Sequence, residues 1–120
     1  MKLLEIASEL SDGRARMRLH GELDLGTVGA AETALAELER EPDATTLVID
    51  LRTLRFMDST GLHFVLGADA RAREGGRRLL VVRGPEAVDR VFRLALPDGR
   101  LTFVDHPDDD DPAAAGVSGA

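Results

Sequence analysis

The chain has 120 residues, 43% of them hydrophobic, and its 15 basic and 22 acidic residues give a formal net charge of −7. This length and composition suit one domain with a single apolar core and exclude an intrinsically disordered chain. A negative charge, with 3% aromatic residues and no Trp or Tyr, argues against direct nucleic-acid binding, which needs a basic field and stacking rings. The lack of cysteine excludes disulfides, a thiolate zinc site and a cysteine nucleophile.

The first residues do not form a signal-type apolar segment, because Lys2 and Glu5 interrupt the apolar run. The sequence also contains no stretch of about 18 apolar residues, the length that a helix needs to span a membrane. We therefore expect a cytoplasmic protein that does not contact a membrane.

Two alternating segments flank the dipeptide Asp12-Gly13. Apolar residues alternate with charged ones over residues 4–10 and 14–19, a pattern that predicts two strands with one buried face. An Asp-Gly pair adopts the positive φ angles of a tight turn, so the strands are expected to form a hairpin. We expect glutamates to pair across its solvent face with the arginines of residues 14–18, which makes these arginines structural and not a binding patch.

Helical and strand-like segments alternate after this hairpin. Apolar residues three and four apart over residues 27–41 predict a first helix, whose start is weakened by Gly26 and Gly29. Residues 47–51 form a short run rich in branched side chains, typical of a strand that is buried on both faces. A loop is expected over residues 52–57.

The second half of the chain repeats this alternation. Each helix is indicated by apolar residues three and four apart and is closed by glycine or proline. The predicted elements are a helix from residue 58 or 59 to the Gly75-Gly76 stop, a strand over residues 79–82, a helix from Pro85 to Pro97 and a short strand over residues 101–104.

The predicted order is β-β-α-β-α-β-α-β. Because helices alternate with the later strands, we expect an α/β fold with a mixed sheet: the N-terminal hairpin is antiparallel, and the other strands are largely parallel and covered by helices. This domain spans residues 1–104. Residues 105–120 carry five acidic and no basic residues, so an acidic, disordered tail is expected. We interpret its Asp108–Asp111 run as a solvated surface and not as a metal site.

The segment Asp58-Ser59-Thr60-Gly61-Leu62 follows the central strand, at the edge of an open α/β sheet where ligands and partners usually bind. Asp58 or Ser59 suits the N-cap of the helix, and Gly61 leaves its first turn open to the approach of another group. The hydroxyl of Ser59 is expected to be exposed. A capped helix without further function explains the pattern equally well.

Three segments together resemble the STAS domain, and more narrowly the bacterial anti-sigma factor antagonists: Gly21–Asp24, Leu47–Leu51 and Phe56–Leu62. The resemblance extends from about Leu3 to Val104. It implies the STAS fold, with which the predicted order of elements agrees, and it implies phosphorylation on Ser59. It also implies regulation of transcription by partner switching. In this scheme the unphosphorylated chain binds an anti-sigma factor of the serine-kinase type and frees a sigma factor, phosphorylation releases the anti-sigma factor, and a serine phosphatase resets the chain.

A phosphate on Ser59 would enter an acidic neighbourhood, because Asp58 precedes it and Glu22 and Asp24 are expected on the adjoining loop. Arg55 is the only arginine or lysine within five residues. We therefore expect the added charge to act at the partner surface without refolding the domain. The domain is expected to be a monomer or a weak dimer, with no cofactor, no metal and no catalytic residue.

A helical projection of the segment after Ser59 turns one apolar stripe towards the sheet, formed by Leu62, Val65, Ala68 and Ala72. The opposite side is small and partly apolar, which suits the docking of a partner helix. Phe64 lies at the margin, where it serves either as a partner contact or as ordinary core. The predicted partner-binding residues are Glu22, Asp24, Asp58, Thr60, Gly61, His63, Phe64 and Gly67.

Other functions fit the motif less well. Ser59 and His63 share one side of the helix, but the sequence has no Gly-x-Ser-x-Gly elbow and Asp58 directly adjoins the serine, so a hydrolase triad is not expected. A phospho-aspartate receiver needs a lysine after a late strand, and the only lysine is Lys2. A nucleotide-binding domain needs a glycine-rich phosphate loop that the sequence lacks. The open alternative is a STAS accessory subunit that docks on a transporter or signalling complex without a phosphorylation switch.

Overall fold

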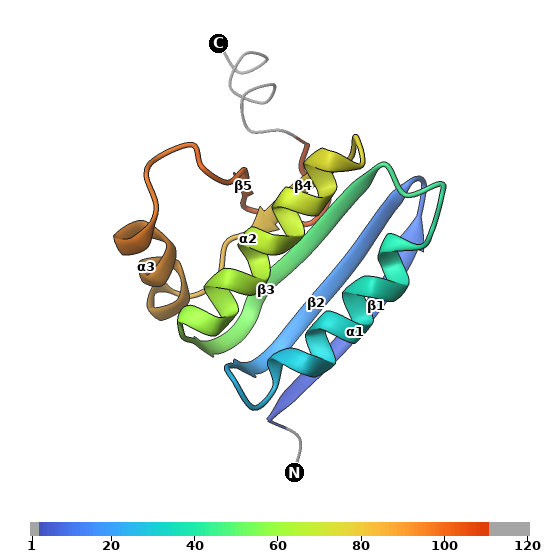
Figure 1. Cartoon of the computed structure of the whole chain (residues 1–120). Helices are drawn as coiled ribbons and strands as arrows, with labels where there is room; N and C mark the ends of the chain where they lie inside the picture. Colours follow the sequence, from blue (N-terminus) through green and yellow to red (C-terminus); the bar gives the residue numbers. More distant parts are fainter. Residues whose placement is uncertain (1–2, 111–120) are drawn as a thin grey trace.

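Figure 1 shows the computed structural model of the chain, which describes residues 3–110. The elements have these bounds: β1 (Leu4–Ser11), β2 (Arg14–Leu23), α1 (Val28–Glu39), β3 (Thr46–Met57), α2 (Ser59–Glu74), β4 (Arg78–Val82), α3 (Glu86–Ala95) and β5 (Phe103–Val104). The predicted order of strands and helices is therefore confirmed.

The strands form one sheet in the order β1-β2-β3-β4-β5. β1 and β2 are antiparallel, whereas β2, β3, β4 and β5 are parallel neighbours. Helices α1 and α2 lie side by side across one face of the sheet, and α3 lies next to α2 on the side away from α1 (Figure 1). The predicted α/β fold, with its mixed sheet and antiparallel N-terminal hairpin, is confirmed.

The turn between β1 and β2 has the predicted geometry, with positive φ angles of 53° at Asp12 and 77° at Gly13. Glu9 lies opposite Arg16 in the hairpin, as expected. The guanidinium of Arg16, however, bonds to the carboxylate of Asp108 at 3.0 Å. Glu9 and Arg16 are thus cross-strand neighbours, but the ion pair that we expected between them does not form, because the Asp108 carboxylate takes the Arg16 guanidinium.

β3 is longer than the sequence pattern indicated. Residues 52–57, predicted as a loop, continue the strand, because Leu54 and Met57 turn into the core and the backbone keeps pairing with β2. The register between the two strands shifts twice along this stretch, and each shift places an extra β3 residue opposite β2. Such irregularities bend a strand, and here the strand ends directly at the start of α2.

The main core fills the space between the sheet and the helices, with Met17, Leu35 and Val65 fully buried. A second, smaller apolar cluster consists of Val48, Leu80, Val82 and Val104. Because side chains alternate along a strand, Val48 points to the opposite face from the residues on either side of it, which belong to the main core. The smaller cluster therefore lies on the helix-free face of the sheet.

Two ion pairs link charged side chains along the surface of α3. Arg93 bonds to Glu86 (2.7 Å) and to Asp89 (2.9 Å). The bond to Glu86 raises the pKa of Arg93, and the same bond lowers the pKa of the Glu86 carboxyl. The Glu86–Arg93 ion pair therefore stabilises the fold above the pKa that Glu86 has in the unfolded chain. This contribution is lost as the pH falls through the lower pKa that Glu86 has in the folded chain.

Residues 105–110, the described part of the acidic C-terminal segment, contact β2. Arg14 and Arg16 donate hydrogen bonds to Pro107, Asp108, Asp109 and Asp110, contacts that the sequence did not indicate. Charge favours these contacts, because the carboxylates of Asp110 and Asp108 meet the two guanidinium groups. The rest of the predicted tail, residues 111–120, lies outside the described residues.

Candidate functional site

The carboxyl ends of β2 and β3 meet at one edge of the sheet, at the lower ends of α1 and α2 in Figure 1. Leu23 pairs with Met57, and the Asp58 N–H donates to the Leu23 carbonyl at 3.4 Å. The turn that carries Asp24 therefore adjoins the start of α2, as expected. This edge holds the predicted motif.

Asp58 is the N-cap of α2. Its Oδ1 accepts hydrogen bonds from the Thr60 N–H (2.9 Å) and the Gly61 N–H (3.4 Å). Of the two predicted candidates, Asp58 and not Ser59 thus caps the helix. Ser59 is the first helical residue, its side chain is exposed, and its hydroxyl has no hydrogen-bond partner within residues 3–110. The hydroxyl is therefore accessible to a group from outside the chain.

The surroundings of the Ser59 hydroxyl are acidic. Asp58 precedes it, and the turn that carries Asp24 directly follows β2, the strand next to β3. Glu22 alternates with the buried Leu23 in β2, so its side chain points to the helix-free face, away from α2. The Asp58 carboxylate already takes two N–H groups of the first helical turn, so few backbone donors remain there for a second anion. A phosphate on Ser59 would add negative charge without a strong partner inside the domain.

The turn between β2 and α1 is held by the hydroxyl of Thr27, which donates to the Glu22 carbonyl (2.8 Å) and accepts the Asp24 N–H (3.0 Å). Asp24 in turn accepts the Gly26 N–H at 3.0 Å. The tip of this rigid turn is Leu25, whose side chain is 80% exposed. Sequence reasoning missed Leu25, although a lone apolar residue in a polar turn beside the motif was the available signal.

A hollow of about 210 Å³ lies between α1 and α2, close to Ser59. Thr60, His63 and Gly67 border it from α2, as the predicted outward face requires. Val28 and Glu32 border it from α1. The sequence did not indicate that α1 takes part, because the pairing of the two helices is a tertiary contact. The apolar stripe that was predicted to face the sheet is buried.

Two of the predicted contact residues, Phe64 and Gly61, are buried. Phe64 is 7% exposed and belongs to the main core, but it also borders the hollow between α1 and α2, so its role as a partner contact stays a prediction. A side chain at Gly61 would meet Met57 Cγ and would lie 3.0 Å from Leu23 Cδ2. The space beside Gly61 is therefore filled by the side chains of Met57 and Leu23, and the expectation that Gly61 leaves room for an outside group is wrong.

The geometry does not form a hydrolase triad. Among the described residues no hydrogen bond links Ser59, His63 and Asp58, because the Asp58 carboxylate is engaged by two backbone N–H groups of its own helix. No group of three or more histidine and acidic side chains suited to a metal ion occurs within residues 3–110. No helix in the same range is long and apolar enough to cross a membrane.

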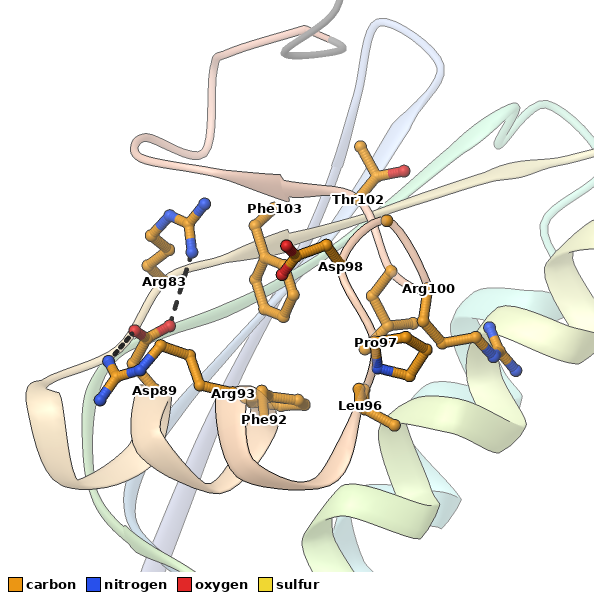
Figure 2. Close-up of a pocket in the computed structure, with 12 residues that line it drawn as sticks. Arg83, Asp89, Phe92, Arg93, Leu96, Pro97, Asp98, Arg100, Thr102 and Phe103 are labelled. Atoms are coloured by element: carbon orange, nitrogen blue, oxygen red, sulfur yellow. Dashed lines mark hydrogen bonds and ion pairs between the residues drawn. The ribbon is translucent and has the colours of Figure 1, made fainter.

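A second hollow, of about 410 Å³, lies between α3 and β5 (Figure 2). The rings of Phe92 and Phe103 meet edge to face with centroids 5.2 Å apart, and Arg83 lies over Phe103 at 5.0 Å. Asp89 pairs with both Arg83 (3.5 Å) and Arg93 (2.9 Å). Because these arginines already have carboxylate partners, the hollow offers little free charge to an anion, and we assign no ligand to it.

The fold and the strand-to-helix motif define the class of this protein. Residues 6–104 match the family model described as "Mlab, STAS domain", and the chain belongs to the STAS domain family. The resemblance that the three sequence segments carried is thereby confirmed.

Within this family the chain is similar to anti-sigma factor antagonists. It is 31% identical over 91 residues to the anti-sigma-F factor antagonist RsfB of Mycobacterium tuberculosis, covering 69% of this chain and 74% of that protein. The structure of an anti-sigma factor antagonist from Mycobacterium paratuberculosis is 25% identical, with a TM-score of 0.74 over 96% of this chain and 94% of that chain.

The fold is also that of SpoIIAA, an anti-sigma factor antagonist solved in two states. The unphosphorylated form is 22% identical and has a TM-score of 0.71, over 97% of this chain and 98% of that chain. The phosphorylated form from Bacillus is 21% identical and has a TM-score of 0.66, over 94% of this chain and 99% of that chain. At these sequence identities, the structural similarity to SpoIIAA supports the fold of this chain and not its function.

Proposed function

We propose that this chain is an anti-sigma factor antagonist in which the Ser59 hydroxyl is the phosphorylation switch. The unphosphorylated chain binds an anti-sigma factor of the serine-kinase type in the cytoplasm, which frees a sigma factor. Phosphorylation releases the anti-sigma factor, and a serine phosphatase restores binding. The chain thus acts as a regulator of transcription, as a monomer or weak dimer, and not as an enzyme.

Two kinds of observation support this proposal. The names of the relatives support the class of function. The site is supported by one feature: a serine hydroxyl that is exposed at the start of α2, beside acidic residues, with no partner within the described part of the chain. A kinase can reach such a hydroxyl without opening the domain.

One phosphate suffices for the switch. It brings about −1.5 to −2 charges at neutral pH. A hundredfold loss of affinity corresponds to about 2.8 kcal/mol. An uncompensated charge buried in a contact surface costs about 2–5 kcal/mol, which covers this requirement. The switch therefore works at the partner surface and needs no refolding of the domain.

The phosphorylation site is tested by incubating the full chain with a purified kinase-type anti-sigma factor and ATP, followed by mass spectrometric mapping. We expect the phosphate on Ser59 and no labelling of a Ser59→Ala variant. A Thr60→Ala variant, which lacks the neighbouring hydroxyl, is expected to carry its phosphate on Ser59 as before. Labelling of Ser59→Ala to the wild-type level would remove Ser59 from the mechanism.

Leu25 is expected to be a main apolar contact of the anti-sigma factor, because an exposed leucine on a rigid turn loses little entropy on binding. We predict that Leu25→Ala weakens binding about fivefold to tenfold, which corresponds to about 1–1.4 kcal/mol. Leu94→Ala, at a residue of α3 that is 75% exposed, is the matched control. Calorimetric titration that gives equal affinities for the two variants would contradict this role.

A further inference from the structure

The helix-free face of the sheet carries a row of arginines from β2. Met17 faces the helices from the same strand, so Arg14, Arg16 and Arg18 point to the other face. Side chains on an uncovered face are normally solvated, yet only 15% of the Arg14 side chain and 22% of the Arg16 side chain are exposed. The chain's own segment Pro107–Asp110 contacts both of them.

The two covered arginines bind this segment through its main chain and through its carboxylates. Arg14 Nη2 donates to two main-chain carbonyl oxygens of the segment, at 2.7 and 3.0 Å. Arg14 Nη1 donates to the Asp110 carboxylate at 3.1 Å, and Arg16 Nη2 donates to the Asp108 carboxylate at 3.0 Å. The surface thus holds an acidic peptide by its backbone and by its charge together.

The segment lies in a groove. It starts after β5 and ends at β2, so it crosses β4 and β3 on the face that carries the smaller apolar cluster. Pro107 is half-buried and borders a hollow of about 210 Å³. The charged residues that line this hollow are three arginines and two acidic residues: Arg16, Arg18, Arg52, Glu9 and Asp50. Arg52 is bonded to Asp50, which raises the pKa of Arg52. We call this surface, formed by Arg14, Arg16, Arg18, Arg52 and the hollow, the arginine groove.

The chain's own segment uses only part of the groove. The Nε–H groups of Arg14 and Arg16 are buried and find no acceptor in the described part of the chain. Arg18 is exposed and makes no ion pair within residues 3–110. The hollow beside Pro107 is open. A longer acidic peptide would find donors and space that the present occupant leaves unused.

We propose that the arginine groove binds an acidic segment of a partner protein, and that Pro107–Asp110 is an intramolecular ligand which this partner displaces. Ion pairs at a surface contribute little and are screened by salt, so the segment is readily displaced. A tethered ligand acts at an effective concentration on the order of millimolar, which keeps weak competitors out. The arginine groove lies on the helix-free face of the sheet, whereas Ser59 begins α2 on the other face (Figure 1), so the proposal does not depend on the switch.

The test measures the binding of a fluorescein-labelled peptide with the sequence of residues 105–110 to the full chain, by fluorescence anisotropy at low salt. We expect Asp108→Asn/Asp110→Asn to bind the peptide about tenfold more tightly than the wild type. In the wild type the tethered segment would occupy the groove for roughly nine-tenths of the time, which leaves about one-tenth of the grooves free for the peptide. Arg16→Gln in that variant is expected to abolish the gain. Glu37→Gln/Asp98→Asn, which removes the same charge at exposed positions elsewhere, is expected to bind like the wild type.

Two results would overturn the proposal. The first is equal peptide affinity of the wild type and Asp108→Asn/Asp110→Asn, or a gain that survives Arg16→Gln. The second comes from sedimentation of the unlabelled proteins. A wild-type dimer that is lost in Asp108→Asn/Asp110→Asn would show that the segment occupies the groove of a second copy, and not its own.

Discussion

A Ser59→Glu variant is expected to bind the anti-sigma factor about a hundredfold more weakly than the wild type, which corresponds to about 2.8 kcal/mol. The carboxylate would stand at an exposed helix start whose Asp58 N-cap already takes two backbone donors, so it gains little compensation within the domain. Ser59→Ala keeps the surface neutral and is expected to bind like the unphosphorylated wild type. Calorimetric titration of the three proteins measures the difference.

The control for this prediction is Ser8→Glu, which makes the same change of charge on an exposed residue of β1. We expect its affinity for the anti-sigma factor to equal that of the wild type. If Ser59→Glu binds as tightly as Ser8→Glu, charge at Ser59 does not control the interface. That result would favour the accessory-subunit function, in which the same surface docks without a switch.

Gly61→Ala is expected to destabilise the domain by about 1–3 kcal/mol, the usual effect of overpacking a core. The added Cβ would meet Met57 Cγ and would lie 3.0 Å from Leu23 Cδ2, and both of those side chains are buried. To make room, the start of α2 must move away from the ends of β2 and β3. Urea unfolding followed by circular dichroism gives the free energy of unfolding for comparison with the wild type.

Gly67→Ala is the matched control on the same helix. Its Cβ would lie 3.4 Å from Nη1 of Arg71, the end of a flexible side chain that can shift. Removing a glycine from a helix interior favours the helix by up to about 1 kcal/mol. We therefore expect Gly67→Ala to be at least as stable as the wild type. Equal loss of stability in both variants would contradict the tight packing assigned to Gly61.

Local pattern was sufficient to predict most of the fold. The Asp12-Gly13 turn and the helical spacing of apolar residues correspond to the observed hairpin and helices. The extension of β3 was missed, because its buried residues Leu54 and Met57 are three apart and break the two-residue period of a strand. The register shifts against β2 explain how both reach the core, and such shifts leave no local signal in a single sequence.

The same limit applies to the sites. The Ser59 motif is continuous in sequence, so its position and exposure were predictable, and so was the neighbouring turn with Asp24. The arginine groove was not predictable, because its contacts join residues from opposite ends of the chain, such as Arg14 and Asp110. Alternation indicated that the arginines lie on the solvent face, but no pattern indicated which carboxylates would meet them.

The central claim is that a negative group on Ser59 blocks the partner while the domain keeps its fold. The most direct test compares the phosphorylated and unphosphorylated full chain by backbone-amide NMR and by titration with the anti-sigma factor. We predict amide shifts confined to the edge where β2, β3 and α2 meet, together with an affinity about a hundredfold lower. An unfolded spectrum of the phosphorylated chain, or an unchanged affinity, would contradict the account.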